Sequence, residues 1–443
     1  MKRKMVRYPK CPPKEPPKEV LKNLNDRMDI DAGLWMTHDP AIYKDPQTGY
    51  YYIYCTGAVC RKSADLIHWE TVGKVVEAPP KESVEWVGGE DIWAPDIVKV
   101  EDEYRLYCSN STWGVRQSCI FLAVAKHAEG PFLPRGCVFK SSDKMPVNAI
   151  DANIIEDAKT GDLYMLYGSF WGGCHVKKLD KATGLALDEG VGVCVANRPS
   201  FMSGAIEGPY MIYNPKTQYY YLFVSYGSLK SDYNVRVGRS KSIEGPFLDF
   251  HGCVLTEEED ANNQVGLLLF GGYRWNDGQA YMAPGHNSVL RDEDGAWYLV
   301  CHIREWNFKD TPEPSTLQVR KLYWTEGGWP MVSAQPYSGE IEQEIPKEEL
   351  YGFYERIDFV PALPQGISTS VPMKLQKDHY YECCSVQGTW RYDAPDSLML
   401  TYGPHRAFCH VTAAWDREQD KRALILTGMT SDGVTFWAKK TGP

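Results

Sequence analysis

The sequence has no long apolar run and no excess of positive charge. A helix needs about 20 consecutive apolar residues to span a bilayer, and no stretch of the 443 residues approaches that length. The formal net charge is −10, whereas binding to a phosphate backbone requires a positive surface. We therefore expect neither a membrane protein nor a nucleic-acid-binding protein.

Motifs for several catalytic chemistries are also missing. No G-x-S-x-G elbow for a serine nucleophile occurs, and neither C-x-x-C nor H-E-x-x-H offers a zinc site. The 13 cysteines are irregularly spaced, which is typical of free thiols in a reducing compartment. The first residues, MKRKMVRYPKCPPKEPPKEVLKNL, are positively charged but lack the apolar segment of a signal peptide. These features predict a cytoplasmic protein; the alternative is a secreted protein from which the signal has been removed.

Helical periodicity is scarce, and aromatic residues make up 13% of the chain. Most of the sequence consists of short aromatic and β-branched runs that are broken by Gly, Pro, Asp and Asn. This pattern is typical of an all-β protein with many tight turns.

Five of these runs repeat one layout: a polar residue, a short apolar run, an acidic turn and a Tyr-rich strand. The repeats begin at intervals of 57, 55, 56 and 79 residues, at Asp39, Asp96, Asp151, Glu207 and His286. Each reads as a β-hairpin, and a period in the mid-fifties fits one four-stranded blade of a propeller. We predict an N-terminal extension over 1–30, a five-bladed β-propeller over 31–340 and a small antiparallel β-barrel over 341–443.

Radial stacking of blades brings equivalent positions of the repeats together near the axis. Four carboxyl groups and an imidazole at one end of a channel would destabilise the fold by crowding charge, which favours a chemical role. Hydrolysis of a glycosidic bond needs one carboxylic acid to protonate the leaving oxygen and one carboxylate to activate water or attack the sugar. A third carboxylate can raise the pKa of the acid. The set therefore predicts a glycoside hydrolase that needs no organic cofactor.

The motifs around these residues resemble glycoside hydrolase family 43, and most closely its two-domain endo-α-1,5-L-arabinanases. They occur in the family's order along the whole propeller: Thr37-His38-Asp39-Pro40, Trp93-Ala94-Pro95-Asp96, Asp151-Ala152-Asn153, GSFWGG from Gly168, Ile206-Glu207-Gly208-Pro209-Tyr210, Arg236-Val237-Gly238-Arg239-Ser240 and Pro284-Gly285-His286-Asn287-Ser288. The C-terminal strands also look like the small barrel of those enzymes.

The resemblance implies a role for each acid. Asp39 would be the general base, Glu207 the general acid, and Asp151 the residue that tunes the pKa of the acid and orients it. The family inverts the anomeric centre, so we expect the carboxyl groups of Asp39 and Glu207 to lie about 6.5–9.5 Å apart. His286 matches the histidine that anchors a calcium-type ion through one nitrogen and a shell of waters. Without the resemblance, a hydrogen-bonded core histidine is the simpler interpretation. The implied partner is plant cell-wall arabinan or its oligosaccharides.

Several residues beside the acids are candidates for binding the glycan. The predicted substrate-binding residues are Trp93, Asp96, Asn153, Ser169, Phe170 and Trp171. The aromatic rings among them could stack on furanose rings or pack within blades, and Asp96 could equally hold a turn.

Three alternatives remain open at this point. An exo-acting α-L-arabinofuranosidase or β-xylosidase would use the same propeller with one end of the groove blocked. A non-catalytic glycan-binding propeller would need the aromatic residues but not all three carboxylates. A glycoside phosphorylase would need a phosphate site, for which Arg198, Arg236 and Arg239 are the candidates.

Overall fold

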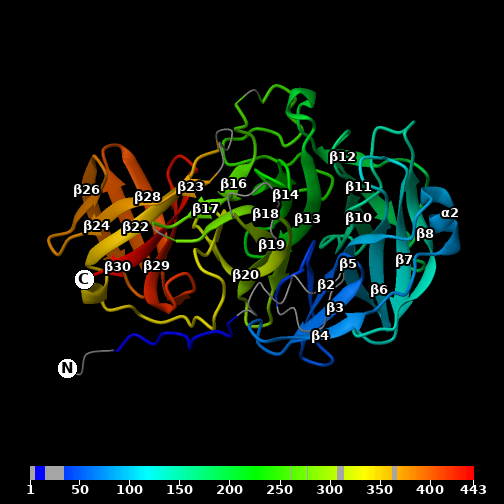
Figure 1. The fold of residues 1–443 in the computed structure, drawn as a ribbon. Helices are drawn as coiled ribbons and strands as arrows, with labels where there is room; N and C mark the ends of the chain where they lie inside the picture. Colours follow the sequence, from blue (N-terminus) through cyan, green and yellow to red (C-terminus); the bar gives the residue numbers. More distant parts are fainter. Residues whose placement is uncertain (1–4, 15–33, 261, 277, 307–313, 362–366) are drawn as a thin grey trace.

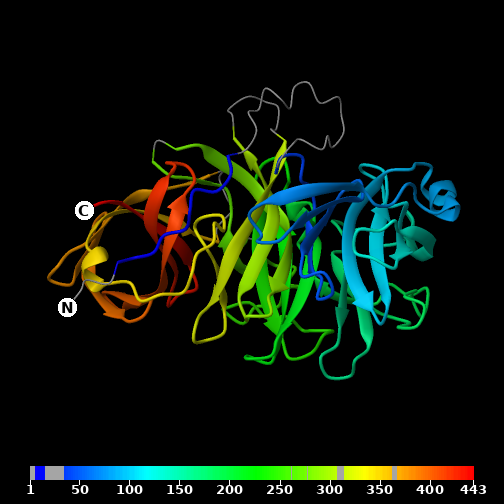
Figure 2. The same ribbon diagram turned by 90° about the horizontal axis from the view of Figure 1, so that it is seen from below.

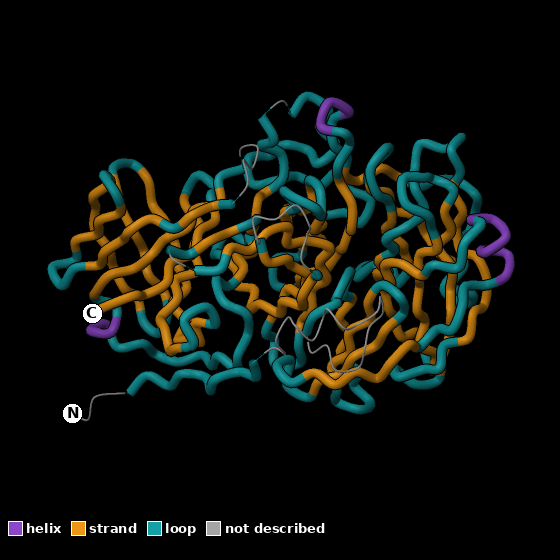
Figure 3. The backbone as a smooth tube through the Cα atoms, in the orientation of Figure 1, coloured by secondary structure: helices purple, strands orange, loops and turns teal. Residues whose placement is uncertain are grey.

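The computed structural model describes residues 5–14, 34–260, 262–276, 278–306, 314–361 and 367–443. Two β-structures lie side by side, a propeller and a barrel (Figure 1). Helices are few and short (Figure 3): α2 spans Lys81–Val87, η1 spans Ser200–Met202 and η2 spans Lys347–Glu349. None of the helices in the described residues is long and apolar enough to cross a membrane.

The propeller has five sheets, each with four antiparallel blade strands in chain order, which confirms the predicted architecture; in blade 5 the added strand β23 pairs in parallel with β17. Blade 1 holds β1 (Ala41–Lys44), β2 (Tyr51–Cys55), β3 (Val59–Ser63) and β4 (Trp69–Lys74); blade 2 holds β5 (Ile92–Val100), β6 (Glu103–Asn110), β7 (Ser118–Ala125) and β8 (Leu133–Ser141); blade 3 holds β9 (Asn153–Glu156), β10 (Leu163–Tyr167), β11 (Cys174–Leu179) and β12 (Val193–Ala196). Blade 4 holds β13 (Ile206–Asn214), β14 (Tyr219–Tyr226), β15 (Asn234–Ser240) and β16 (Leu267–Phe270); blade 5 holds β18 (Ala280–Arg291), β19 (Trp297–Glu305), β20 (Ser315–Trp324) and β21 (Pro330–Val332), extended by β17 (Tyr273–Arg274) and β23 (Ser368–Thr369).

The hairpins that open the blades follow from their turn sequences. In D-P-Q-T-G and D-A-K-T-G the glycines, Gly49 and Gly161, both have φ of 75°, a conformation that is costly for residues with a side chain. The first strands of neighbouring blades contact one another around the ring, including β1 with β18 where the ring closes. This arrangement brings the beginnings of the five repeats together at the axis.

The C-terminal barrel closes on itself through pairing of its first and last strands, as the sequence predicts. Its strands are β22 (Gly352–Phe359), β24 (Val371–Leu375), β25 (Tyr380–Cys383), β26 (Val386–Asp393), β27 (Ser397–Tyr402), β28 (His405–Asp416), β29 (Lys421–Thr430) and β30 (Thr435–Gly442). Side chains such as Trp390, Leu400 and Phe436 form one buried cluster in the barrel.

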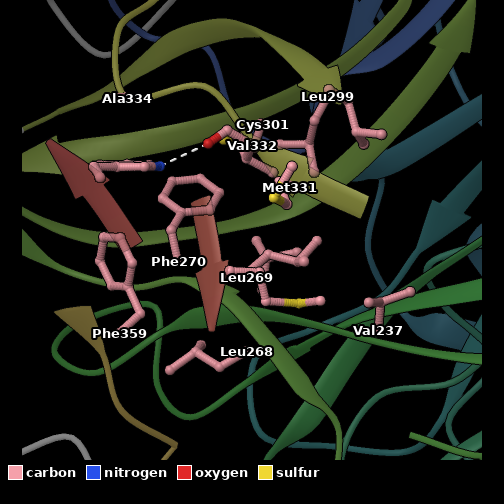
Figure 4. Packing of buried hydrophobic residues seen from close by; sticks show 14 of the residues in the cluster. Val237, Leu268, Leu269, Phe270, Leu299, Cys301, Met331, Val332, Ala334 and Phe359 are labelled. Carbon is pink, nitrogen blue, oxygen red and sulfur yellow. Dashed lines mark hydrogen bonds between the residues drawn. The ribbon is translucent and has the colours of Figure 1, made fainter. Parts of the chain in front are cut away.

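A shared apolar core joins the barrel to the propeller. Phe359 and Trp437 of the barrel belong to the same buried cluster as Phe270 of blade 4 and Leu299 of blade 5, and Figure 4 shows part of this packing. The indole Nε1 of Trp437 donates a hydrogen bond of 2.6 Å to the Val332 carbonyl oxygen. Since apolar burial stabilises by about 25 cal/mol per Å², this continuous core favours a fixed arrangement of the two parts.

The N-terminal residues 5–14 run along the barrel towards the propeller (Figure 2). Gln343 exchanges two hydrogen bonds with the backbone of Arg7, and the ammonium group of Lys14 lies 3.0 Å from the Asp420 carboxylate. The predicted extension therefore contacts the barrel in its described part; the rest of it lies outside the described residues.

Hydrogen bonds between successive inner strands tie the blades together. At three junctions a side chain on one inner strand accepts the backbone N–H of the next inner strand. The pairs are Asp96 Oδ2 with Ile154 (2.6 Å), Asn153 Oδ1 with Met211 (2.9 Å) and Ser288 Oγ with Ile42 (3.1 Å). The Ser288 bond, together with a single β-bridge between Trp35 and Thr316, crosses from blade 5 to blade 1 and closes the ring.

These bonds correct two predictions about substrate binding. Asp96 and Asn153 are 3% and 2% exposed, and both side chains bind backbone N–H groups between blades. Asp96 pairs with Tyr107 as Ala41 pairs with Tyr54, so its counterpart in blade 1 is Ala41 and not Asp39. Both residues therefore brace the ring, and neither lines the hollow at its axis.

Candidate active site

A hollow of about 260 Å³ lies at the axis, where residues on or just before the inner strands of all five blades line it. This central hollow is lined by His38, Asp39, Thr56, Trp93, Trp113, Ile150, Asp151, Glu207, Leu229 and His286. The structure thus brings together the three predicted acids and the predicted metal-binding histidine. Asp96 does not line the hollow.

The backbone at these residues departs from regular strand geometry. Asp39, Asp151 and His286 have φ of 52°, 61° and 46°, and Gly208, which follows Glu207, has φ of 57°. Left-handed conformations at residues other than glycine are costly and persist where the surrounding structure enforces them, often at functional sites. Register shifts at Glu207 and at Gly285 mark β-bulges, which re-aim side chains beside active sites.

A side chain from the preceding blade anchors each of the three strained residues. The anchor accepts the backbone N–H of the functional residue from a position at or near the end of the second strand of the preceding blade. The pairs are Ser109 with Asp151 (2.9 Å), Ser225 with His286 (2.8 Å) and His302 with Asp39 (3.2 Å). The orientation of each functional residue therefore depends on a neighbouring blade.

Asp39 is held as an ionised carboxylate. The Thr56 hydroxyl donates to Oδ2 at 2.6 Å, and Nδ1 of His286 lies 3.0 Å from Oδ1. Burial by itself raises the pKa of Asp39, but the charge of His286 and the Thr56 hydrogen bond contribute to a larger opposing effect, so the pKa lies below its ordinary value. A carboxylate in this state can accept a proton from water.

Glu207 and Asp151 have the opposite tendency. Burial raises the pKa of Glu207, against the influence of His286 and of the hydrogen bond that Ser169 donates to its Oε2 at 2.8 Å. Burial also raises the pKa of Asp151 to about 7, and the negative charges of Glu207 and Asp39 add to this increase. The hollow therefore combines an ionised carboxylate with a carboxyl group inclined to keep its proton, which is the pairing that acid–base catalysis requires.

The surroundings of His286 fit a cation in charge and in donor type. Asp39, Asp151 and Glu207 each raise the pKa of His286, although its burial opposes them, because their negative charge favours a positive group at this place. With Nδ1 facing Asp39, Nε2 is the nitrogen left to bind an ion. Calcium prefers oxygen ligands, so a single nitrogen suits it only if water supplies most of the coordination.

A second set, His38, Asp39 and His302, has potential ligand atoms within 4.8 Å of one another. The rings of His38 and His302 are stacked, with centroids 4.4 Å apart and planes inclined by 20°. Nearly parallel rings do not direct their in-plane lone pairs at one point, and Nδ1 of His302 already accepts the N–H of Asp39. We therefore do not assign a metal to this set.

Two further hollows adjoin the central one, each against a different set of blades. The aromatic hollow, of about 770 Å³, lies against blades 2, 3 and 4 and includes Trp93, Trp113, Ser169, Phe170, Trp171, Phe201 and Glu207. The polar hollow, of about 1050 Å³, lies against blades 1, 2 and 5 and includes His38, Thr56, Glu77, Glu90, Asp91, Trp93 and Arg304. Both share lining residues with the central hollow, so within the described part of the chain the groove continues past the acids toward both sets of blades.

The aromatic hollow contains the predicted stacking residues and two that the sequence did not reveal. Trp93, Ser169, Phe170 and Trp171 line it as expected for substrate-binding residues. Trp113 and Phe201 join them, and these rings are 68% and 62% exposed. Exposed aromatic side chains that gather around one groove indicate a binding surface, because monomeric proteins seldom expose such patches without a ligand.

The candidate phosphate-binding arginines do not converge. Arg236 is fully buried and donates to the carbonyl oxygens of Asn263 and Val265. Arg239 stacks on the Trp329 ring at 4.2 Å, and Arg198 donates to the Ala205 carbonyl oxygen. This arrangement disfavours the phosphorylase alternative.

Known families and proteins match both parts of the chain. Residues 35–330 match the family described as glycosyl hydrolases family 43, and residues 334–438 match a C-terminal lipocalin-like domain. The chain is 31% identical over 450 residues to the extracellular endo-α-(1→5)-L-arabinanase of Thermotoga petrophila, covering 91% of this chain and 93% of that protein. The crystal structure of the endo-1,5-α-L-arabinanase from the same organism superposes with a TM-score of 0.83 at 29% identity, covering 92% of this chain and 99% of the other.

Two more relatives cover different shares of the chain. The extracellular endo-α-(1→5)-L-arabinanase 2 of Bacillus subtilis is 29% identical over 446 residues, 91% of this chain and 92% of that protein. The extracellular exo-α-(1→5)-L-arabinofuranosidase of Cellvibrio japonicus is 31% identical over 330 residues, 70% of this chain and 89% of that protein. The two relatives above that each cover 91% of this chain are both named as endo-arabinanases.

The prediction of a cytoplasmic location is wrong, since these similar enzymes are named as extracellular. The prediction relied on free thiols as a sign of a reducing compartment. In the structure all 13 cysteines are free, and eight are buried, where thiols are shielded from oxidants. In this chain, free cysteines were therefore not a valid indication of a reducing compartment.

Proposed function

Because the chain belongs to glycosyl hydrolase family 43, we propose that it cleaves internal α-1,5 linkages of L-arabinan with inversion at the anomeric carbon. The observation that carries this function is the groove itself: a central hollow holds Asp39, whose pKa is lowered, together with Glu207, whose pKa is raised by burial, and two further hollows adjoin it. A groove that continues in both directions accommodates a chain that extends past the cleavage point at each end. An exo-acting enzyme needs one of these directions blocked.

In the proposed reaction Asp39 accepts a proton from the attacking water, and Glu207 donates its proton to the departing glycosidic oxygen. Thr56 and His286 stabilise the charge and fix the orientation of Asp39 before the reaction begins. Asp151 accepts a hydrogen bond of 3.2 Å from the backbone N–H of Gly208, which places its carboxyl group beside the acid. A non-catalytic glycan-binding propeller has no need for this division between acid and base.

The experiment that tests this function is a comparison of viscosity with reducing ends during digestion of linear α-1,5-arabinan. Internal cleavage lowers viscosity steeply while few reducing ends have formed, and the first products are oligosaccharides of several lengths. Release of arabinose alone from the start, with viscosity falling in proportion to reducing ends, would favour the exo-acting alternative.

Replacing Asp151 by asparagine should move the alkaline limb of the pH–rate profile to lower pH. The charge of Glu207 raises the pKa of Asp151, and a charge–charge interaction is reciprocal, so ionised Asp151 also raises the pKa of Glu207. Removing that charge lowers the pKa of the acid, which then loses its proton at lower pH; we expect a shift of roughly one unit. A kcat profile with an unmoved alkaline limb would exclude this tuning role.

The exposed rings of the aromatic hollow should increase the affinity for long substrates. Phe201→Ala and Trp171→Ala remove rings that line the aromatic hollow but not the central one. We expect KM for arabinan to rise about tenfold in each, equivalent to about 1.4 kcal/mol, with hydrolysis of an aryl arabinofuranoside unchanged. Phe353→Ala is the matched control, since this ring is 51% exposed on the barrel. Equal changes for both substrates would contradict a role in binding distant sugar units.

We also propose that a calcium-type cation is held at His286, where it would add positive charge near the carboxylates. Calcium should raise the melting temperature of the wild-type protein and increase its activity after chelation, and His286→Ala should lose both responses. His286 is anchored by its backbone N–H to Ser225, so loss of the side chain leaves that anchor in place. If calorimetry showed that His286→Ala binds calcium with wild-type affinity, the cation would have to lie elsewhere.

A further inference from the structure

His302 is a buried residue that neither the sequence analysis nor the proposed reaction uses. It lies on β19 of blade 5, is 0% exposed, and lines none of the three hollows of the groove. Its Nδ1 accepts the backbone N–H of Asp39 at 3.2 Å, across the junction where blade 5 meets blade 1. The general base of the proposed reaction therefore stands at the point where the ring closes.

The ring of His302 is held in a column of flat groups. The His38 ring stacks on it with centroids 4.4 Å apart, and the Tyr233 ring is a second, nearly parallel neighbour, with centroids 5.9 Å apart and planes inclined by 14°. Tyr233 in turn needs Gly285, because a Cβ atom at that position would lie 2.1 Å from the Tyr233 ring. The column combines residues of blades 1, 4 and 5 and leaves the imidazole little freedom to rotate.

The chemistry of the imidazole also fits an acceptor role. Burial, together with the neighbouring His38 and Arg304, keeps the pKa of His302 well below its ordinary value, so the ring is neutral and Nδ1 carries a lone pair. The hydrogen is then on Nε2, a buried atom with no hydrogen-bond partner among the described residues. Leaving this donor unpaired destabilises the folded state. The fixed acceptor that the ring provides for the N–H of Asp39 offsets this cost.

We propose that His302 is a positioning residue that holds the backbone of Asp39, and with it the general base, in its left-handed conformation across the closing junction of the propeller. Ser109 and Ser225 hold Asp151 and His286 in the same way with hydroxyl groups. At the closing junction, where the chain does not run from the outer strand of blade 5 into the inner strand of blade 1, a rigid ring replaces the hydroxyl. This inference rests on the proposed role of Asp39.

The test compares two substitutions of His302 that separate ring from acceptor. His302→Phe keeps a flat ring for the column but removes the acceptor, and we expect kcat on arabinan to fall about 10²-fold, as for a small misplacement of a reacting group, with KM unchanged. His302→Asn places an amide oxygen near the position of Nδ1 and should recover most of kcat. His302→Leu, which is smaller and equally lacks an acceptor, replaces the Phe variant if that variant does not fold.

Ser288→Ala is the control for simple weakening of the junction. Ser288 accepts the N–H of Ile42 and donates to the Pro40 carbonyl oxygen across the same junction, without contacting Asp39. It should lower the melting temperature and leave kcat of the folded enzyme unchanged. Aryl substrates with good and poor leaving groups should lose activity equally in His302→Phe, because water activation is needed for both.

Three outcomes separate the inference from the function on which it rests. Full kcat in both His302→Phe and His302→Leu, while Asp39→Ala is inactive, would overturn the positioning role alone. An equal loss of kcat in Ser288→Ala would also overturn it, because any weakening of the junction would then suffice. Normal activity in Asp39→Ala would instead overturn the assignment of the base.

Discussion

Replacement of Asp39 by alanine is expected to lower turnover on arabinan by about 10²–10⁴-fold or more, as for removal of a general base. Asp39 is the carboxyl group of the central hollow whose pKa lies below its ordinary value, so it is the one ready to accept the proton of water. A better leaving group does not remove the need to activate water. The loss should therefore be as large on an aryl arabinofuranoside as on arabinan.

Asp39→Asn is the matched control for this result. It keeps an oxygen for the Thr56 hydroxyl and the backbone bond to His302, but it cannot accept a proton at neutral pH. Turnover should fall as far as in Asp39→Ala, while the melting temperature stays closer to that of the wild-type protein. Near-normal rates in a folded Asp39→Asn would mean that another group activates water.

Replacement of Glu207 by alanine should produce an equally large loss on arabinan and a much smaller one on activated substrates. The alkoxide of a sugar leaves poorly unless it is protonated, and Glu207 is the acid whose pKa is raised by burial. An aryl group that leaves as a stable phenolate needs little protonation. The ratio of wild-type to variant kcat should therefore shrink as the pKa of the leaving group falls.

Glu207→Gln supplies the control, since it retains an oxygen for the Ser169 hydrogen bond but has no acidic proton. It should follow Glu207→Ala in its dependence on the leaving group. A loss of activity that is the same for all leaving groups would assign Glu207 a role in water activation or in folding rather than in protonation.

Much of the fold was predictable from the period of the sequence. The spacing of the hairpin repeats, with Gly49 and Gly161 in their turns, predicted the length of one blade. Short connections between blades then predicted that the blades follow one another in chain order. Counting from the first strand alone placed Asp96 with the acids, however. In the structure Asp96 aligns with Ala41, which lies two residues after Asp39. This register is visible only once the hairpin partners are known.

The anchoring residues were missed because the repeats were compared only at their first strands. The anchors occupy equivalent places on the second strands, because Ser109, Ser225 and His302 each stand three residues after a leucine, on β6, β14 and β19. Aligning these second strands would have revealed the set. Trp113 and Phe201 carry no such signal, because they lie between strands, and only the folded chain brings them to one hollow.

The central claim is that Asp39 activates water and does not attack the sugar. Proton NMR of the products at the earliest times of arabinan-oligosaccharide hydrolysis tests it most directly, because it reads the anomeric configuration before mutarotation. Inversion of an α-linked substrate predicts that the newly formed reducing end appears first as the β-anomer. Appearance of the α-anomer first would require a covalent glycosyl-enzyme and would make a carboxylate of this hollow the nucleophile.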